Sequence, residues 1–340
     1  MAPAISVAGR RVECLENQSI LEALLRAGVW MPNSCNQGTC GTCKLQVLSG
    51  EIDHRDSPQE TLSSQERTQG LALACQARPL RDTEVALRGA DETRSTHVLH
   101  DLAGTVAKVE EIARDTRRIL IDLDEALEFY AGQYIELTVP GTTERRQYSL
   151  ANIADENTVL ELHVRRVPGG LASDKWLFGT VAAGDRVEGL GPLGDFHVPP
   201  TEEDAGEPMV LIGGGTGLAP LVGIVRTALA RHPSREVVLY HGVRGQSDLY
   251  DGGVFAELEA TYAGFRFVPV LSDETSPEHR NGFPTDAFLE DIASCRGWSG
   301  WLCGPPPMVE AGVKAFKRRR MTPRLIHREK FTPADALARA

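Results

Sequence analysis

Four cysteines constrain this chain more than any other feature of its 340 residues. They are Cys35, Cys40, Cys43 and Cys75, with the spacing C-x4-C-x2-C followed by one distant cysteine. This spacing is typical of a two-iron, two-sulfur cluster, in which four thiolates converge on two irons. Gly38 and Gly41 would let the loop wrap closely, because glycine has no Cβ and accepts a positive φ. A zinc site is the alternative, but zinc favours two close cysteine pairs, whereas one cysteine here stands alone.

The segments around these cysteines resemble those of a plant-type ferredoxin. The matching stretches are Asn33–Cys43 and Leu73-Ala-Cys-Gln76. The resemblance implies a β-grasp domain over residues 1–92 that carries one electron at a time. The local pattern agrees, since it predicts a hairpin around Gly9 and a helix that Ser19 caps and Gly28 ends.

Short strand-like runs, separated by turn residues, fill residues 102–203. They are 104–109, 118–123, 134–139, 147–150, 159–167 and 186–190. This spacing predicts an antiparallel β-barrel. A polar stretch before it predicts a linker over 93–101, and an acidic segment at 201–207 marks a second boundary.

The rhythm changes to strand, turn and helix over residues 204–340. Strands are expected at 209–212, 236–241, 266–271 and 300–302, and helices at 219–230, 254–262, 285–292 and 307–318. This alternation predicts a doubly wound parallel sheet. The chain as a whole is therefore expected to combine α+β and α/β domains. The Ala-rich tail after Thr332 would be a short helix or frayed.

Two strings in the predicted barrel meet the needs of a flavin nucleotide. They are Arg146-Gln147-Tyr148-Ser149 and Gly169-Gly170-Leu171-Ala172-Ser173. The guanidinium of Arg146 suits a pyrophosphate, and the free N–H groups of a helix beginning at Gly170 would hold its second phosphate. Tyr148 would pack on the ring or the ribityl chain, and Ser149 would hydrogen-bond the ring near N5.

Together the two strings resemble the FAD-binding segments of the ferredoxin–NADP reductase superfamily. The resemblance implies cofactor contacts for Arg146, Tyr148, Ser149, Gly169, Gly170 and Ser173. It also places His163, Val164 and Arg165 on the strand that faces FAD. Arg165 is equally well explained as a surface residue of that strand.

A glycine-rich turn follows an apolar strand and opens a helix. It consists of Gly213, Gly214, Gly215, Thr216 and Gly217. The turn departs from the G-x-G-x-x-G fingerprint, because Leu218 stands where the third glycine would fall. Its backbone would still approach a pyrophosphate closely at a helix start. A tight turn without a ligand is the alternative.

The loop Cys303-Gly304-Pro305 follows another strand. In the same superfamily such a loop places a cysteine beside nicotinamide C4 and flavin N5, so the resemblance implies a catalytic position for Cys303. Its neighbours Gly304 and Pro305 would contact the nucleotide. The alternative for Cys303 is a small core residue.

The segment Glu329-Lys330-Phe331 is similar to the C-terminal segment of oxygenase reductases. Phe331 either covers the flavin face that nicotinamide must reach or packs in the core. The donor is expected to be NADH rather than NADPH. Arg244 would bind the nucleotide, but its loop has no second basic residue for a 2′-phosphate.

The order of ferredoxin, FAD and NAD segments resembles the reductases of benzoate dioxygenase, phenol hydroxylase and methane monooxygenase. This implies that hydride passes from NADH to FAD, and that single electrons pass through the cluster to a terminal oxygenase of the Rieske or di-iron kind. Hydride transfer needs alignment of nicotinamide C4 with flavin N5. Two alternatives stay open: a reductase for a deoxysugar dehydrase, which uses the same modules, and a non-catalytic redox sensor.

Composition narrows the setting of this chemistry. The net charge of −11 argues against a nucleic-acid partner. No apolar run has the length that a membrane span needs, so membrane insertion is not expected. Seven cysteines, four of them clustered by spacing, argue for metal in a reducing compartment. The chain is expected to be cytoplasmic and monomeric when free.

Overall fold

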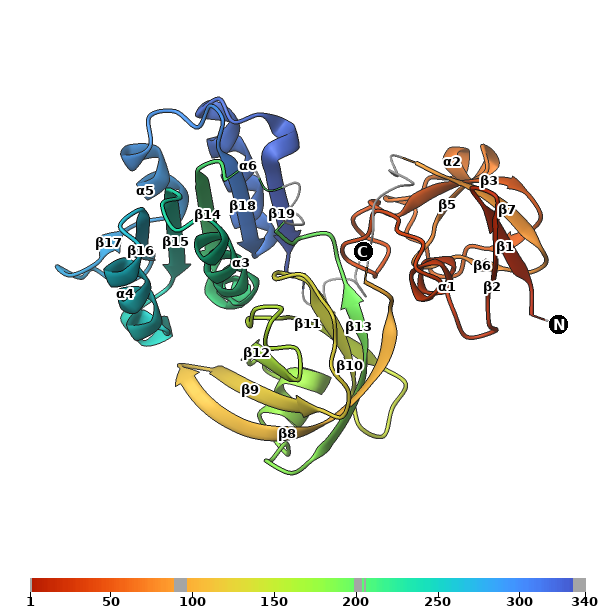
Figure 1. Cartoon of the computed structure of the whole chain (residues 1–340), viewed down its shortest axis with the longest axis horizontal. Helices are drawn as coiled ribbons and strands as arrows, with labels where there is room; N and C mark the ends of the chain where they lie inside the picture. Colours follow the sequence, from red (N-terminus) through yellow and green to blue (C-terminus); the bar gives the residue numbers. More distant parts are fainter. Residues whose placement is uncertain (1, 89–96, 199–203, 205, 333–340) are drawn as a thin grey trace. The chain divides into compact units, whose positions relative to one another are not determined.

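The computed structural model describes residues 2–88, 97–198, 204 and 206–332 (Figure 1). These residues fall into two compact units. Unit 1 comprises Met1–Asp101 with Leu190–Asp195, and unit 2 comprises Leu102–Gly189 with Phe196–Arg339. The predicted domain boundaries, at 92, 101 and 203, stay predictions, and residues 93–96, 199–203 and the tail 333–340 lie outside the described part.

Unit 1 contains a five-stranded sheet in the order β2-β1-β7-β3-β5. Its strands are β1 (Ala4–Val7), β2 (Arg10–Glu13), β3 (Lys44–Ser49), β5 (Leu71–Leu73) and β7 (Thr83–Leu87). Smaller elements are α1 (Ile20–Arg26), α2 (Ser64–Thr68), β4 (Ile52–Asp53) and β6 (Arg78–Pro79). The predicted N-terminal hairpin is confirmed, since β1 and β2 pair antiparallel.

Helix α1 forms where the sequence predicts it. The Ser19 side chain accepts a hydrogen bond from the Glu22 backbone N–H, and the Glu22 side chain accepts one from the Ser19 backbone N–H. These bonds satisfy donors that a helix start otherwise leaves unpaired. Leu21 and Leu24 of the helix are fully buried, and each contributes about 2 kcal/mol of hydrophobic stabilisation.

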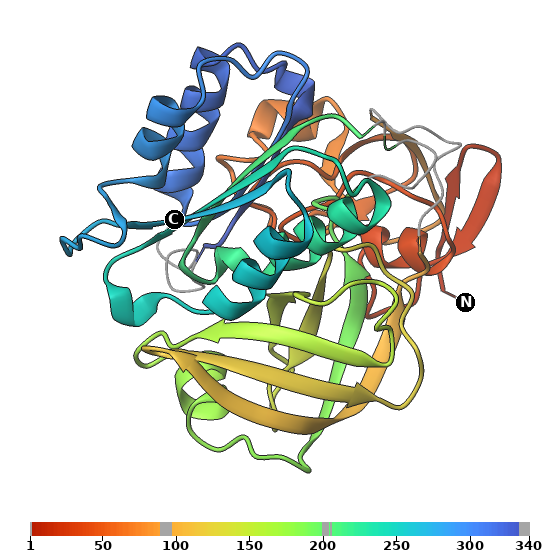
Figure 2. The same ribbon diagram turned by 60° about the vertical axis from the view of Figure 1, so that its left-hand side comes forward.

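Unit 2 begins with a six-stranded sheet in the order β11-β10-β13-β8-β9-β12, which is strongly curved (Figure 2). Its strands are β8 (His100–Ala113), β9 (Thr116–Leu123), β10 (Tyr134–Thr138), β11 (Arg145–Ser149), β12 (Val159–Arg165) and β13 (Arg186–Leu193). An isolated bridge between Leu150 and Leu162 brings the β11 and β12 ends of the sheet together. The predicted strands are confirmed, although β8 begins at His100, within the predicted linker.

The second sheet of unit 2 is entirely parallel, in the order β17-β16-β15-β14-β18-β19. Its strands are β14 (Met209–Gly214), β15 (Val237–Val243), β16 (Phe265–Leu271), β17 (Arg280–Asn281), β18 (Ser299–Gly304) and β19 (Ile326–Lys330). The helices are α3 (Leu218–Arg231), α4 (Gly252–Thr261), α5 (Pro284–Asp291) and α6 (Pro306–Arg318). The predicted doubly wound sheet is confirmed.

Alternate residues of β14 pack into different cores. Leu211 lies in a core with residues of α3 and α4, and Ile212 in a core with residues of α5 and α6. The strand order reverses at β14, whose neighbours are β15 and β18. Ligands of doubly wound sheets bind at this switch point, beyond the carboxyl ends of the strands. No helix in the described part of the chain is long and apolar enough to span a bilayer.

Candidate functional site

The four predicted cluster cysteines form two close pairs in unit 1. Cys43 Sγ lies 3.2 Å from Cys75 Sγ. The Cys40 thiol hydrogen-bonds Cys35, and this bond lowers the pKa of Cys35 to about 5. Two thiol pairs suit two irons, because a [2Fe–2S] cluster takes four thiolates in all. Among the residues described, no group of three or more His, Cys, Asp or Glu is arranged to hold a single metal ion.

The backbone of the cysteine loop also fits a cluster. The N–H groups of Gln37 and Cys40 donate to Cys35 Sγ, at 3.5 and 3.4 Å. Gly38 has a φ of +78°, and a Cβ there would lie 3.0 Å from the Pro58 side chain. Gly41 has a φ of +72°. These positions require glycine for the reason that the sequence predicts, a left-handed turn in a tight loop.

Strand β11 carries the first predicted flavin string in unit 2. Arg146 is about a quarter exposed, and its Nη1 donates to Glu144 Oε2 over 2.8 Å. Tyr148 packs partly buried against the core of the curved sheet, and this burial raises its pKa. Ser149 is buried at the end of the strand. The string therefore offers an accessible guanidinium and a buried hydroxyl.

The second flavin string opens a short π-helix over Leu171–Leu177. Gly169 has a φ of +77°, and its N–H donates to Asp174 Oδ2 over 2.8 Å. A Cβ at Gly170 would lie 2.7 Å from Ser173 Oγ, so the glycine keeps this turn tight. The Asp174 carboxylate would therefore compete with a phosphate for the Gly169 N–H. The sequence prediction did not include this competition.

The three residues predicted to face FAD on β12 have different environments. Val164 is buried in the core of the curved sheet, so its backbone alone is available to a cofactor. His163 is fully buried, with Nε2 2.9 Å from Glu161 Oε1. Arg165 Nη1 lies 3.5 Å from Asp248 Oδ1. Arg165 thus has a partner that neither predicted alternative named.

The glycine-rich turn spans the end of β14 and a 3-10 turn over Gly215–Gly217. A Cβ at Gly217 would lie 2.2 Å from the Cys303 carbonyl oxygen, and one at Gly214 would lie 2.7 Å from Met308 Sδ. These two glycines let the turn pack against the Cys303 loop. Gly215 differs, because its φ is +54° and nothing lies within 4 Å of an added Cβ. Gly215 is the position of the turn that is open to a ligand.

Cys303 on β18, Ser149 at the end of β11 and a third residue, Glu329 on β19, contact one another in unit 2. Ser149 Oγ donates to Glu329 Oε2 over 3.2 Å, and Cys303 Sγ lies 3.8 Å from the same oxygen. Burial raises the pKa of Glu329 to about 7. Burial, together with the Glu329 carboxylate, raises the pKa of the Cys303 thiol. The site therefore combines a neutral thiol with a carboxyl that titrates near neutral pH.

The sequence prediction missed Glu329 as a site residue. It lies on the edge strand β19, where it faces Cys303 in the register between β18 and β19. No local pattern marks it as buried, because its neighbours Arg328 and Lys330 are also charged. The sequence offered one clue to Glu329, since it belongs to the segment Glu329-Lys330-Phe331 that is similar to the C-terminal segment of oxygenase reductases. In the structure the Phe331 N–H donates to the Gly304 carbonyl over 2.9 Å. The Phe331 ring packs partly buried against the core that contains Cys303.

The other residues predicted to bind the nicotinamide nucleotide lie at or just after the carboxyl ends of β15 and β18. Arg244 is exposed directly after β15. Pro305 caps α6. Gly304 has a φ of +142°, and a Cβ there would lie 3.0 Å from the Gly214 backbone nitrogen.

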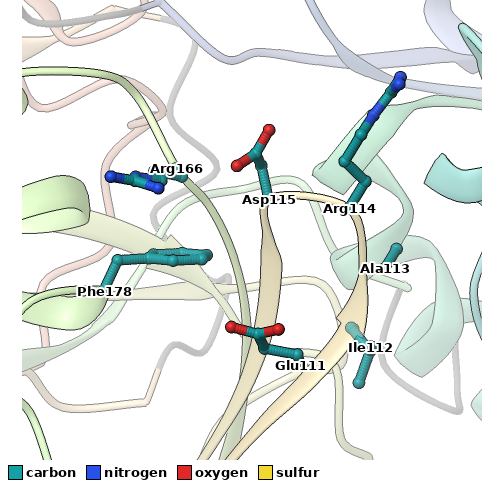
Figure 3. Close-up of a pocket in the computed structure, with 7 residues that line it drawn as sticks. All are labelled: Glu111, Ile112, Ala113, Arg114, Asp115, Arg166 and Phe178. Atoms are coloured by element: carbon teal, nitrogen blue, oxygen red, sulfur yellow. The ribbon is translucent and has the colours of Figure 1, made fainter.

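A separate open pocket of about 500 Å³ lies at the turn between β8 and β9 (Figure 3). Its lining residues are Glu111, Ile112, Ala113, Arg114, Asp115, Arg166 and Phe178. The Arg166 guanidinium lies 6.0 Å from the centre of the Phe178 ring. None of the predicted cofactor residues lines this pocket, so it is distinct from the expected flavin position.

Comparison with known families matches three consecutive parts of the chain. Residues 5–80 match the 2Fe-2S iron-sulfur cluster binding domain. Residues 103–198 match the oxidoreductase FAD-binding domain, and residues 211–314 match the oxidoreductase NAD-binding domain. The fold and the site thus define an NAD(P)H-dependent oxidoreductase that uses FAD and a [2Fe–2S] cluster.

Individual relatives narrow this class. The aromatic O-demethylase reductase subunit of Amycolatopsis sp. is 73% identical over 98% of this chain and all of its own. The reductase component of phenol 2-monooxygenase from Pseudomonas sp. is 36% identical over 97% of this chain and 94% of its own. The crystal structure of an Amycolatopsis cytochrome P450 reductase, also 73% identical, superposes with a TM-score of 0.96 over 98% of this chain and all of its own. The chain belongs to the family of reductase components that supply electrons to oxygenases.

Proposed function

We propose that this chain passes electrons from NADH through FAD and the cluster to a cytochrome P450 that O-demethylates aromatic compounds. The observation that carries the choice of acceptor is the 73% identity, over nearly the whole chain, to an aromatic O-demethylase reductase subunit and to a cytochrome P450 reductase. This acceptor differs from the Rieske or di-iron oxygenase that the sequence resemblance implies.

The site residues of unit 2 would orient the reacting groups. Arg146 and the helix start at Gly170 would bind the FAD pyrophosphate, and Ser149 would lie at the ring. When bound, FAD accepts two electrons as hydride and releases them one at a time. Cys303 and Glu329 would exclude water from the meeting point of nicotinamide and flavin, since both are buried. No acid or base is needed, so alignment is the contribution of the chain.

Acidic residues support NADH as the donor. Asp273 and Glu274 follow β16, and the Glu274 carboxylate accepts from the Gln246 N–H over 2.8 Å, in the loop that carries Arg244. The Asp273 N–H donates to the Arg244 carbonyl over 3.0 Å. Both carboxylates thus belong to a segment that contacts the Arg244 loop, and negative charge there would disfavour a 2′-phosphate more than a 2′-hydroxyl.

The donor is tested by steady-state kinetics with NADH and NADPH. We expect kcat/KM to be higher with NADH than with NADPH. In the double variant Asp273→Ser, Glu274→Gln, the ratio of the two kcat/KM values should fall about tenfold, which corresponds to an electrostatic change of about 1.4 kcal/mol. The Arg186→Ala variant, which alters an exposed pair on β13, is the control. Equal use of both donors by the wild type would contradict the choice of NADH.

The acceptor is tested by reconstitution. With NADH, O2, a methoxylated aromatic compound, the chain and an aromatic O-demethylating P450, formaldehyde release is expected, and it should fail with the Cys40→Ser variant. Coupling to a dehydrase instead of the P450 would favour the deoxysugar alternative. An absence of NADH oxidation with artificial acceptors would favour the redox sensor.

We also propose that the free chain is a cytoplasmic monomer without a nucleic-acid partner. Its net charge of −11 disfavours binding to phosphate backbones. Light scattering of the purified protein should give a mass near 37.0 kDa. A dimer mass would contradict the monomer.

A further inference from the structure

The segment Asp248-Leu249-Tyr250-Asp251, here called the acidic turn, connects the 3-10 turn after β15 to helix α4. Both of its carboxylates are buried, with side chains 2% and 7% exposed. Burying a carboxylate is unfavourable unless it is paired. The acidic turn therefore depends on its partners.

The charged partners of these carboxylates come from the curved sheet, while Asp248 also accepts a hydrogen bond from the Gly245 N–H of its own loop over 3.1 Å. Arg114 binds Asp248 with both arms, Nε to Oδ1 at 3.0 Å and Nη2 to Oδ2 at 2.6 Å. The Arg114 backbone N–H also donates to the Ser247 carbonyl over 2.9 Å. Arg118 pairs with Asp251. Figure 3 shows the Arg114 side chain directed away from Arg166 and Phe178, which line the same pocket. The Arg114 guanidinium therefore points away from these two residues and pairs with the acidic turn.

The acidic turn also reaches the glycine-rich turn. Tyr250 lies between two histidine rings, with centroids 5.2 Å from His163 and 5.4 Å from His241. The Tyr250 hydroxyl donates to the Gly215 carbonyl over 3.5 Å, and His241 Nε2 lies 3.0 Å from the same oxygen. Gly215 is the position of the glycine-rich turn at which an added Cβ would meet no atom within 4 Å, so it is where we expect the nucleotide to approach. One continuous set of contacts thus runs from Arg114 to that position.

We propose that the acidic turn positions bound NADH relative to FAD. The arginines of β8–β9 hold the acidic turn, and Tyr250 transmits that position to the glycine-rich turn. This inference rests on the proposed transfer of hydride from NADH to FAD. That step is sensitive to placement, since a displacement of about 1 Å can slow a reaction about 100-fold. Asp251 has a φ of +58°, a left-handed backbone that its surroundings must maintain.

The test compares two bidentate arginine–aspartate pairs. Arg114→Ala removes the contact to the acidic turn, whereas Arg186→Ala removes an exposed pair with Asp124 that lies within the curved sheet. Stopped-flow absorbance measures FAD reduction by NADH in each FAD-loaded variant. We expect Arg114→Ala to reduce FAD about tenfold more slowly or worse, with unchanged FAD content, and Arg186→Ala to match the wild type.

Two further measurements separate positioning from stability. The kinetic isotope effect with NADH deuterated at C4 should rise in Arg114→Ala, because hydride transfer becomes the slow step. Asp248→Asn should slow the reaction, because it weakens the pairs of Asp248 with both Arg114 and Arg165. Combined with Arg114→Ala, it should slow the reaction by less than the product of the two single effects, because both changes remove the Arg114–Asp248 pair.

Equal rates of FAD reduction in Arg114→Ala and Arg186→Ala would overturn the inference. The inference would also be overturned if Arg114→Ala were slow but had lost FAD and melted at a lower temperature, while Arg114→Lys was fully active. That pattern would show that Arg114 contributes to stability alone. Failure of the wild type to reduce FAD with NADH would instead refute the proposed function.

Discussion

The buried carboxyl of Glu329 makes the stability of unit 2 depend on pH. Its pKa of about 7 in the folded chain, against an ordinary 4.5, corresponds to about 3 kcal/mol at about 1.4 kcal/mol per pH decade. The folded state favours the protonated form. This contribution is therefore fully present below about pH 4.5 and is lost as the pH rises through about 7. The variant Glu329→Gln keeps the shape of the side chain and cannot ionise.

Urea unfolding of the wild type and Glu329→Gln, followed by tryptophan fluorescence, measures this contribution. We expect the wild type to lose about 2 to 3 kcal/mol relative to the variant between about pH 5 and about pH 8. Taking the difference between the two proteins cancels the titration of every other group. A difference that stays constant within about 0.5 kcal/mol across this range would refute the assignment of a raised pKa to Glu329.

Four further substitutions have predicted outcomes. Cys40→Ser should abolish electron delivery through the cluster to cytochrome c while sparing NADH reduction of FAD, and cytochrome c reduction at the wild-type rate would remove the cluster from the route. Arg146→Ala should lose FAD on dialysis, and unchanged flavin content would count against its phosphate role. Gly217→Ala should destabilise the chain by about 1 to 3 kcal/mol in a thermal melt, because its Cβ would lie 2.2 Å from the Cys303 carbonyl. Gly253→Ala, with nothing within 4 Å, should stabilise it by up to about 1 kcal/mol, and equal melting of the two variants would refute the packing argument.

Local patterns in the sequence predict most of the architecture. The capping serine and apolar spacing define α1, and strand–turn–helix alternation predicts the parallel sheet. The C-x4-C-x2-C spacing predicts a loop that brings Cys35 and Cys40 together. These features depend on neighbouring residues, so they can be read without knowledge of the tertiary fold.

Features that depend on distant contacts could not be predicted in this way. Glu329 becomes a site residue only because β19 pairs with β18 and removes it from water. The bidentate partner of Asp248, Arg114, lies 134 residues away in the chain, so no local pattern could predict this pair. The sequence predicts that the glycine-rich turn lets its backbone approach a pyrophosphate. In the structure, however, Gly217 is required because the turn packs against the Cys303 loop.

The proposed function requires one chain to relay electrons from NADH through FAD to a [2Fe–2S] cluster. Freeze-quench electron paramagnetic resonance and stopped-flow absorbance can follow this relay in anaerobic protein mixed with excess NADH. We expect flavin absorbance to fall first and the signal of a reduced [2Fe–2S] cluster to follow. A cluster signal that never forms after the flavin is reduced, or one that precedes flavin reduction, would contradict it.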